Sequence, residues 1–222
     1  MGKGVFITAT GTDVGKTYIT GLIVKKLQRE GHLAGYYKAA LSGAVSVKKS
    51  DAGYVKQFSG ITQSDETLVS YMYKQAVSPH LASRLEKKPV RLDKVYADYM
   101  HVKNQCEYVT VEGSGGIVCP ILWEKDKKIL LEDLIKEFKL PVVLVADSGL
   151  GTINVTTLTA AYLKDRKMEV KGIIMNHFNG SAMHQDNRRM IEELTQIPVV
   201  ATVKEKEKEI KIGTEKLLSF FA

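Results

Sequence analysis

The sequence predicts an α/β fold in which a doubly wound, mainly parallel sheet is flanked by helices. Strand patterns and helical patterns alternate along nearly the whole chain, which is typical of repeated βα units. The run PVVLV at residues 141–145 is apolar on both faces, as a central strand of a parallel sheet requires. The chain has no internal repeat and no low-complexity linker, so we predict a single domain over residues 1–222.

The composition indicates a globular protein. Hydrophobic residues make up 44% of the chain and charged residues 26%, and no apolar run reaches the length of a membrane span. The N-terminus lacks the apolar core of a signal peptide. The two cysteines, Cys106 and Cys119, have no metal-binding spacing. We therefore expect a cytoplasmic protein in a reducing compartment, without a membrane partner.

The net charge of +7 raises the question of a nucleic-acid partner. The lysines are scattered, however, and the densest cluster, KEKEKEIK from Lys204, alternates with glutamates. Such alternation is typical of a solvated surface, so we expect no nucleic-acid partner. The positive charge would favour an anionic small substrate by long-range steering.

The stretch VFITATGTDVGKTY at residues 5–18 predicts a phosphate-binding loop between a strand and a helix. The loop ends in GKT at residues 15–17, where backbone N–H groups and the helix N-terminus favour phosphate. Lys16 would reach the terminal phosphates, and the Thr17 hydroxyl can ligate Mg²⁺. The usual motif would have glycine where this chain has Thr10, so the loop is a variant. The motif indicates a P-loop NTPase-like fold.

A second candidate residue follows the next predicted strand. Residues 17–30 have helical spacing, Gly31 supplies a C-terminal stop, and residues 33–37 read as a strand. This succession implies a parallel βαβ crossover, in which ligands gather at the carboxyl ends of the strands. Lys38 comes directly after the strand. It could hold a second anionic group, or it could be an ordinary exposed lysine.

Asp51 is a third candidate, at the start of a predicted helix over residues 51–58 that Ser50 could cap. Its carboxylate could face Mg²⁺, or it could simply complement the helix N-terminus. The pattern then predicts a strand at residues 68–73 and helices at residues 78–85 and 93–104.

Residues 108–111 read as a buried strand that ends in Glu112, and the run GSGG follows at residues 113–116. An acidic residue that closes a buried strand is where P-loop enzymes hold a Mg²⁺-facing carboxylate. The glycines would let the backbone approach a phosphate or a substrate closely. We interpret this segment as functional rather than as a plain turn, because it falls at the edge where the phosphate loop predicts it.

The run GLGTIN at residues 149–154 leads into an apolar helix that continues to Leu163. A glycine-flanked helix N-terminus at the edge of the sheet can bind a carboxylate or phosphate, although it can also be only a loop and a cap. The remaining predicted elements are a helix at residues 130–138, a strand at 170–175 closed by Asn176, a helix at 183–195, a strand at 198–203 and a helix at 215–221.

Together these motifs resemble the dethiobiotin synthetase family over nearly the whole chain. TATGTDVGKT resembles the stretched phosphate loop of that family, and Asn176 matches its base-contacting asparagine. The other matches are KAALS at Lys38 with K-P-x-x-S, SDA at Ser50 with the Mg²⁺ aspartate, SPHLAS at Ser78 with S-P-H-x-A, EGSGG at Glu112 with E-G-A-G-G, and LGTIN at Leu150 with L-G-x-I-N.

The chain departs from the family pattern at several positions. Asp13 stands where an acidic residue, usually glutamate, is common, Ala39 replaces a proline and Ser114 replaces an alanine. None of these changes removes a charged group. After Pro198 the usual L-G-x-I-P run is replaced by VVATVKEKEKE, so the adenine-side contacts from this region are expected to differ.

The resemblance implies a ring closure that depends on ATP and Mg²⁺. In it, 7,8-diaminopelargonate and CO₂ give dethiobiotin, ADP and phosphate. One amine captures CO₂ as a carbamate, whose oxygen attacks the γ-phosphoryl group to give a mixed carbamic–phosphoric anhydride. The second amine then closes the ureido ring and expels phosphate. The family also implies a homodimer with the active site at its interface.

The resemblance implies a role for each matching residue. Lys16 neutralises the phosphates together with Mg²⁺, and Lys38 holds the carbamate; Thr12 and Asp13 complete the catalytic set. Thr17, Asp51 and Glu112 are the metal ligands or their water-linked partners. The nucleotide site comprises Asp13, Val14, Gly15, Lys16, Thr17, Tyr18, Asp51, Glu112, Gly113, Ser114, Gly115 and Asn176. In the substrate site, Ser42 and Thr12 would hydrogen-bond the diamine or the carbamate. The tail carboxylate of the substrate would be bound by four residues of the neighbouring subunit: Gly151, Thr152, Ile153 and Asn154.

Two alternatives share the predicted fold. A nucleotide-dependent switch ATPase of the chromosome-partitioning or division-site type carries a signature lysine early in the phosphate loop, where this chain has Gly11, and a membrane-binding amphipathic tail that this sequence lacks. The cobyrinate-amidating ligases carry an added glutaminase domain, for which 222 residues leave no room.

Overall fold

The computed structural model describes residues 2–222. A seven-stranded sheet forms its centre, with the strand order β3-β2-β4-β1-β7-β8-β9 and parallel pairing between all neighbours. From β1 the chain runs out through β2 to the edge strand β3, returns to β4 beside β1, and then crosses to β7 and runs out through β8 to β9, as in a doubly wound sheet. The seven strands are β1 (Lys3–Ala9), β2 (Ala34–Leu41), β3 (Val69–Met72), β4 (Tyr108–Glu112), β7 (Val142–Asp147), β8 (Val170–Asn176) and β9 (Val199–Thr202).

Helices connect most of these strands. They are α1 (Lys16–Arg29), α2 (Asp51–Ser59), α3 (Pro79–Leu85), α4 (Leu92–Gln105), α5 (Leu131–Phe138), α6 (Thr152–Asp165), α7 (Ala182–Thr195) and α8 (Thr214–Leu218), with short 3₁₀ helices η1 (Val47–Lys49) and η2 (Asp65–Thr67). Within residues 2–222, no helix combines the length and the apolar character that crossing a bilayer would need.

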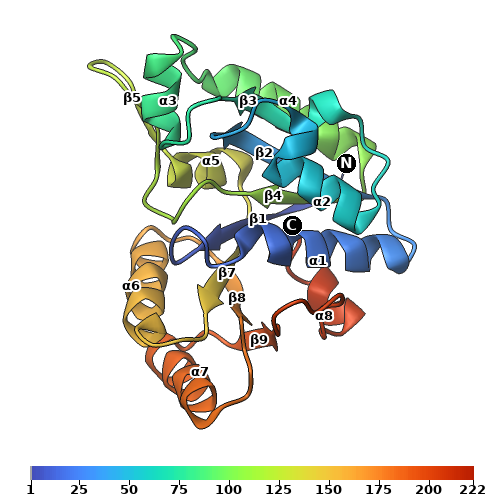
Figure 1. Cartoon of the computed structure of the whole chain (residues 1–222), viewed down its shortest axis with the longest axis vertical. Helices are drawn as coiled ribbons and strands as arrows, with labels where there is room; N and C mark the ends of the chain where they lie inside the picture. The colour runs from blue at the N-terminus through green and yellow to red at the C-terminus, as the bar shows by residue number, and fades with distance from the viewer. Residues whose placement is uncertain (1) are drawn as a thin grey trace.

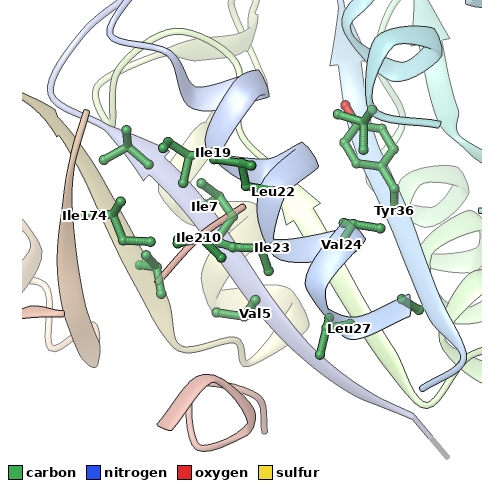
Figure 2. Packing of buried hydrophobic residues seen from close by; sticks show 14 of the residues in the cluster. Val5, Ile7, Ile19, Leu22, Ile23, Val24, Leu27, Tyr36, Ile174 and Ile210 are labelled. Carbon is green, nitrogen blue, oxygen red and sulfur yellow. The ribbon is translucent and has the colours of Figure 1, made fainter. Parts of the chain in front are cut away.

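The helices cover both faces of the sheet (Figure 1). On one face α1, α2 and α8 form a core with β1 and β2, and Figure 2 shows Ile19, Leu22 and Ile23 of α1 packed over Ile7 of β1. On the other face α3, α4 and α5 pack against β2 and β4, and Ile191 of α7 packs against β7 and β8. The sheet is thus buried on both sides, as a parallel sheet requires.

The two tyrosines of β2 illustrate how side chains alternate between these faces. Tyr36 belongs to the core beside α1, whereas Tyr37 belongs to the core beside α4 and α5. Successive residues of a strand point to opposite faces, so Lys38 lies on the same face as Tyr36. This alternation determines which residues of β2 reach the phosphate loop.

The predicted α-helices and strands are confirmed in type and order, and the two 3₁₀ helices were not predicted. Two further differences concern β2 and a hairpin. The strand expected at residues 33–37 continues to Leu41, because β2 also pairs with the edge strand β3 at Lys38 and Leu41. Lys38 therefore lies inside a strand, and the expectation that it directly follows one was wrong. An antiparallel hairpin, β5 (Pro120–Trp123) and β6 (Lys128–Leu130), was not predicted, because the charged run between its short strands hides the alternation.

Candidate active site

A cleft of about 740 Å³ opens at the carboxyl edge of the sheet, beside the phosphate loop. The loop between β1 and α1, the end of β2, the start of α2 and the last residue of β4 form its walls. Among the described residues its lining contains four lysines and three carboxylates: Lys16, Lys38, Lys48, Lys49, Asp13, Asp51 and Glu112. This charge distribution suits an anionic ligand with a bound cation.

The phosphate loop is held in a conformation that depends on glycine. Gly15 has φ 89° and caps α1, and a Cβ at this position would collide with the side-chain amide of Asn176. Asp13 also has positive φ, 59°, which aspartate tolerates better than most residues. The first turn of α1 contains no acidic residue, so its positive end is left for an anion.

Lys16 is the first residue of α1, and only 7% of its surface is exposed. Burial lowers the pKa of its ammonium group, and the nearby Lys38 lowers it further, while Glu112 and Asp51 oppose the shift. An anion in the cleft would therefore stabilise the charged form of Lys16.

Lys38 connects the two carboxylates of the cleft. Its Nζ lies 2.6 Å from Asp51 Oδ2 and 2.7 Å from Glu112 Oε1. Burial of the 4%-exposed lysine opposes its charge, but the two carboxylates outweigh burial and raise the pKa of Lys38 above its ordinary value. Lys38 is therefore a buried ammonium ion and not an ordinary surface lysine.

Glu112 is hydrogen-bonded through both carboxylate oxygens. Oε1 accepts from Thr17 Oγ1 at 2.8 Å as well as from Lys38, and Oε2 accepts from Tyr36 Oη at 3.1 Å. Burial and the neighbouring carboxylates raise the pKa of Tyr36 well above its ordinary value, so its hydroxyl remains a donor. The sequence reasoning missed Tyr36, although its spacing of two residues from Lys38 places both on one strand face.

The donors that surround Thr17 fit Mg²⁺. This ion binds oxygen ligands, and in nucleotide sites it takes one or two carboxylates, substrate phosphates and water. The Thr17 hydroxyl and the Glu112 and Asp51 carboxylates are such oxygens, and the two carboxylates already hold a cationic group, the Lys38 ammonium. Residues 2–222 contain no cluster of three acidic, histidine or cysteine side chains that would hold a metal without substrate.

Ser42 lines the cleft just beyond the end of β2. Its Oγ is buried and has no hydrogen-bond partner among the described residues. A buried polar atom without a partner is costly, so a ligand group at this position would be favoured. Thr12 also lines the cleft, and its side chain is exposed.

Asn176, at the end of β8, lies behind the phosphate loop. Its amide Nδ2 donates a hydrogen bond to the Val14 carbonyl at 3.1 Å and also lies 3.1 Å from His177 Nε2. His177 Nδ1 is in turn 2.6 Å from Asp147 Oδ2. The loop and the end of β8 are therefore joined directly.

The start of α6 is a separate part of the same sheet edge. Gly151, with φ 89°, caps the helix, and the preceding loop is fixed by hydrogen bonds from Asn187 Nδ2 to the carbonyls of Ser148 and Gly149. Leu150 is 95% exposed. The four residues predicted to bind the substrate tail, Gly151, Thr152, Ile153 and Asn154, do not line the cleft of their own chain.

The cleft brings together most of the residues that the sequence singled out. It is lined by Thr12, Asp13, Gly15, Lys16, Thr17, Tyr18, Lys38, Ser42, Asp51, Glu112 and Gly115, whereas Val14, Gly113, Ser114, Asn176 and residues 151–154 lie outside its lining. Ser114 instead donates from Oγ to the Ala40 carbonyl at 2.6 Å. The sequence reasoning did not single out Tyr54 and Gln57, although they follow Asp51 at intervals of three on one face of α2.

Comparison with solved structures supports the fold assignment. The chain is similar to the MinC:MinD cell division complex of Aquifex aeolicus, with a TM-score of 0.59 and 15% identity, covering 93% of this chain and 83% of that one. A ParA family ATPase of Chlorobium tepidum gives a TM-score of 0.59 and 13% identity, covering 99% and 90%. The fold and the phosphate loop define this chain as a P-loop nucleotide-binding protein.

Sequence comparison identifies the family. The family described as "AAA domain" matches residues 3–210. The ATP-dependent dethiobiotin synthetase BioD of Clostridium botulinum is 48% identical over 100% of this chain and 99% of its own length. That of Brachyspira hyodysenteriae is 47% identical over 91% and 92%, respectively. The chain belongs to the ATP-dependent dethiobiotin synthetase family.

Proposed function

We propose that this protein closes the ureido ring of dethiobiotin from 7,8-diaminopelargonate, CO₂ and MgATP, releasing ADP and phosphate, in biotin biosynthesis. The observation that carries the proposal is the presence of Lys38, a second buried ammonium group, in the same cleft as the phosphate-loop Lys16. A switch ATPase has no second anionic substrate to hold beside the nucleotide. A ligase that joins a carboxylated amine to ATP must also hold a second anion near the γ-phosphate.

Lys16 and the start of α1 bind the phosphates of ATP in this proposal. The N–H groups of Gly15, Lys16 and Thr17 face the anion, and the Lys16 ammonium balances its charge. Thr17, Glu112 and Asp51 hold Mg²⁺ directly or through water. When bound, Mg²⁺ neutralises the charge that develops on the transferred phosphoryl group.

Lys38 holds the carbamate that forms when one amine of the diamine takes up CO₂. Its ammonium lies between the two carboxylates that we assign to Mg²⁺, so it can turn from them to a carbamate at the γ-phosphate without leaving the cleft. Ser42 bonds the diamine or carbamate through its unpartnered Oγ, and Thr12 and Asp13 do so from the phosphate loop. Positioning and charge stabilisation would then supply most of the rate.

The nucleotide base lies on the β8 side of the phosphate loop in this proposal. Asn176 contacts it, Val14 and Tyr18 flank it, and Gly113, Ser114 and Gly115 support the phosphate side. The direct bond between Asn176 and Val14 supports this placement, because it joins the base side to the phosphate loop.

A homodimer completes the substrate site. The N-terminus of α6 lies outside the cleft of its own chain, so Gly151, Thr152, Ile153 and Asn154 would reach a substrate tail in the cleft of a partner subunit. The first four N–H groups of a helix lack intrahelical partners and suit a carboxylate. Leu150, Val155 and Leu158 are 95%, 40% and 62% exposed on and beside α6, and a partner subunit would bury them.

The proposal also covers the domain organisation of the protein and its location in the cell. We take residues 1–222 as one catalytic domain that acts on small molecules. A cytoplasmic location accords with the free thiols of Cys106 and Cys119, because cysteines stay reduced there.

The direct test traces the carbon of labelled bicarbonate into the product. The purified protein is incubated with MgATP, isotopically labelled bicarbonate and 7,8-diaminopelargonate, and the products are analysed by mass spectrometry. We expect one labelled carbon per molecule of dethiobiotin, at an equal yield of ADP. Unlabelled product, or label that acid releases as CO₂, would contradict the proposal.

A further inference from the structure

We propose that Tyr36 is a positioning residue for the metal site, because its hydroxyl fixes the Glu112 carboxylate so that only Oε1 faces the nucleotide. The inference rests on the proposed function in one respect, that Glu112 serves the Mg²⁺ that accompanies the nucleotide. It does not depend on which second substrate the cleft takes.

The register of the sheet places Tyr36 and Glu112 on one face. Tyr36 pairs with Thr110 across the β2–β4 ladder, and Glu112 lies two residues further along β4. Because side chains alternate with a period of two, Tyr36, Thr110 and Glu112 share a face. Figure 2 shows the Tyr36 ring over β2, with its hydroxyl pointing away from Val24 and Leu27 of α1. The ring thus reaches from the core toward the carboxyl edge.

The hydrogen bonds of Glu112 divide its two oxygens between core and cleft. Its side chain is 0% exposed, so each oxygen needs a protein partner or a ligand. Oε2 takes the Tyr36 hydroxyl, and Oε1 takes Thr17 Oγ1 and Lys38 Nζ. Without the hydroxyl, Oε2 would be a buried charged oxygen without a donor, and rotation of the carboxylate would relieve that cost. Tyr36 therefore keeps Oε1 in place beside Thr17.

Tyr37 provides a matched comparison on the adjacent position of the same strand. Both tyrosines are 0% exposed, and both hydroxyls are hydrogen-bonded. The Tyr37 hydroxyl, however, contacts Ser70 Oγ at 2.6 Å and donates to the Val95 carbonyl at 2.9 Å on the opposite face of the sheet. Loss of either hydroxyl removes a buried donor, but only the loss at Tyr36 affects a carboxylate of the cleft.

The test measures how binding of a non-hydrolysable ATP analogue depends on Mg²⁺, by calorimetry and without the diamine. Tyr36→Phe should raise the Mg²⁺ concentration for half-maximal enhancement about tenfold or more, as is usual when a partner of a metal ligand is removed. Binding in EDTA should stay within about twofold of the original chain, and Tyr37→Phe should leave the Mg²⁺ dependence within about twofold.

An unchanged Mg²⁺ dependence in folded Tyr36→Phe would overturn the proposal, as would an equal shift in Tyr37→Phe. If the affinity of the original chain for the analogue did not depend on Mg²⁺, the metal role of Glu112 would be overturned. The positioning role of Tyr36 would be overturned with it. Failure of the ring closure itself would leave all these readings intact, because no diamine is present.

A second pair of variants covers loss of folding. If Tyr36→Phe does not fold, it is combined with Glu112→Gln, which leaves no unpartnered carboxylate, and compared with Glu112→Gln alone. Rescue of folding by the glutamine shows that the hydroxyl acts through Glu112 and supports the proposal. Equal failure to fold in the double variant assigns Tyr36 to packing only and overturns it.

Discussion

Lys38 is charged, buried and paired with two carboxylates at once. A single buried ammonium would lose its proton more readily, but Glu112 and Asp51 raise its pKa above the ordinary value of 10.5. The charged form is therefore present throughout the physiological pH range. A cation held this firmly beside a phosphate loop suits the recognition of a second anion.

Lys38→Ala should separate ATP binding from turnover. We expect ATP affinity within a few-fold of the original chain, because Lys16 and the loop remain, and a loss of turnover of about 100-fold or more. Calorimetry with ATP and a phosphate-release assay measure the two quantities. Lys48→Ala is the control, since Lys48 also lines the cleft but is exposed and should change turnover little. Loss of ATP binding in Lys38→Ala would show that Lys38 serves the nucleotide instead.

Cys119 should make stability depend on alkaline pH. Burial raises the pKa of its thiol from 9.0 to about 11. Because the folded chain holds the thiol proton more tightly than the unfolded chain, the contribution of Cys119 to the free energy of unfolding is complete below the unfolded pKa. This contribution is lost as the pH rises through the folded pKa. By about pH 10 the loss relative to about pH 8 should be about 1.4 kcal/mol. Cys119→Ala should remove that part of the slope, so its cost in free energy of unfolding should be about 1.4 kcal/mol smaller at about pH 10 than at about pH 8, as denaturant unfolding would measure. If the free energy of unfolding of Cys119→Ala fell with pH as steeply as that of the original chain, the raised pKa of the Cys119 thiol would be contradicted.

The order of the elements could be predicted because each has a strong local pattern. Apolar strands, helical spacing and glycine stops gave the alternation of β1, α1 and β2. The hairpin β5–β6 could not be predicted, because its strands have only four and three residues and its turn is fully charged. The extension of β2 past Lys38 depends on pairing with β3, a contact between distant segments that no local pattern contains.

Helix α6 provides the prediction at the scale of elements. Leu158 is 62% exposed on this helix, and the proposed dimer would bury it. Leu158→Lys should shift the protein toward a monomer, because an unpaired charge in an apolar interface costs several kcal/mol. Light scattering after gel filtration measures the mass, and turnover should fall with it. Leu194→Lys, at a 52%-exposed leucine on α7, is the matched control. A dimer that survives Leu158→Lys would place the interface elsewhere.

The cleft is assembled from segments that lie far apart in the sequence. The parallel sheet brings the phosphate loop, Lys38 and Glu112 to one edge, and this gathering could be predicted because ligands lie at the carboxyl ends of parallel strands. The side-chain contacts within the cleft could not be predicted from the sequence. The bonds from Lys38 to two carboxylates, and from Tyr36 to one of them, depend on side-chain reach across neighbouring strands. The position of the α6 N-terminus outside its own cleft depends on the winding of the whole sheet.

The central claim is that this cleft couples the γ-phosphoryl group of ATP to carboxylation of a diamine. The measurement that tests it most directly is phosphate release from MgATP with and without 7,8-diaminopelargonate and bicarbonate. We predict release only when both are present, with one phosphate per dethiobiotin formed. Release at the background rate in the presence of both, or equal release without the diamine, would contradict the claim.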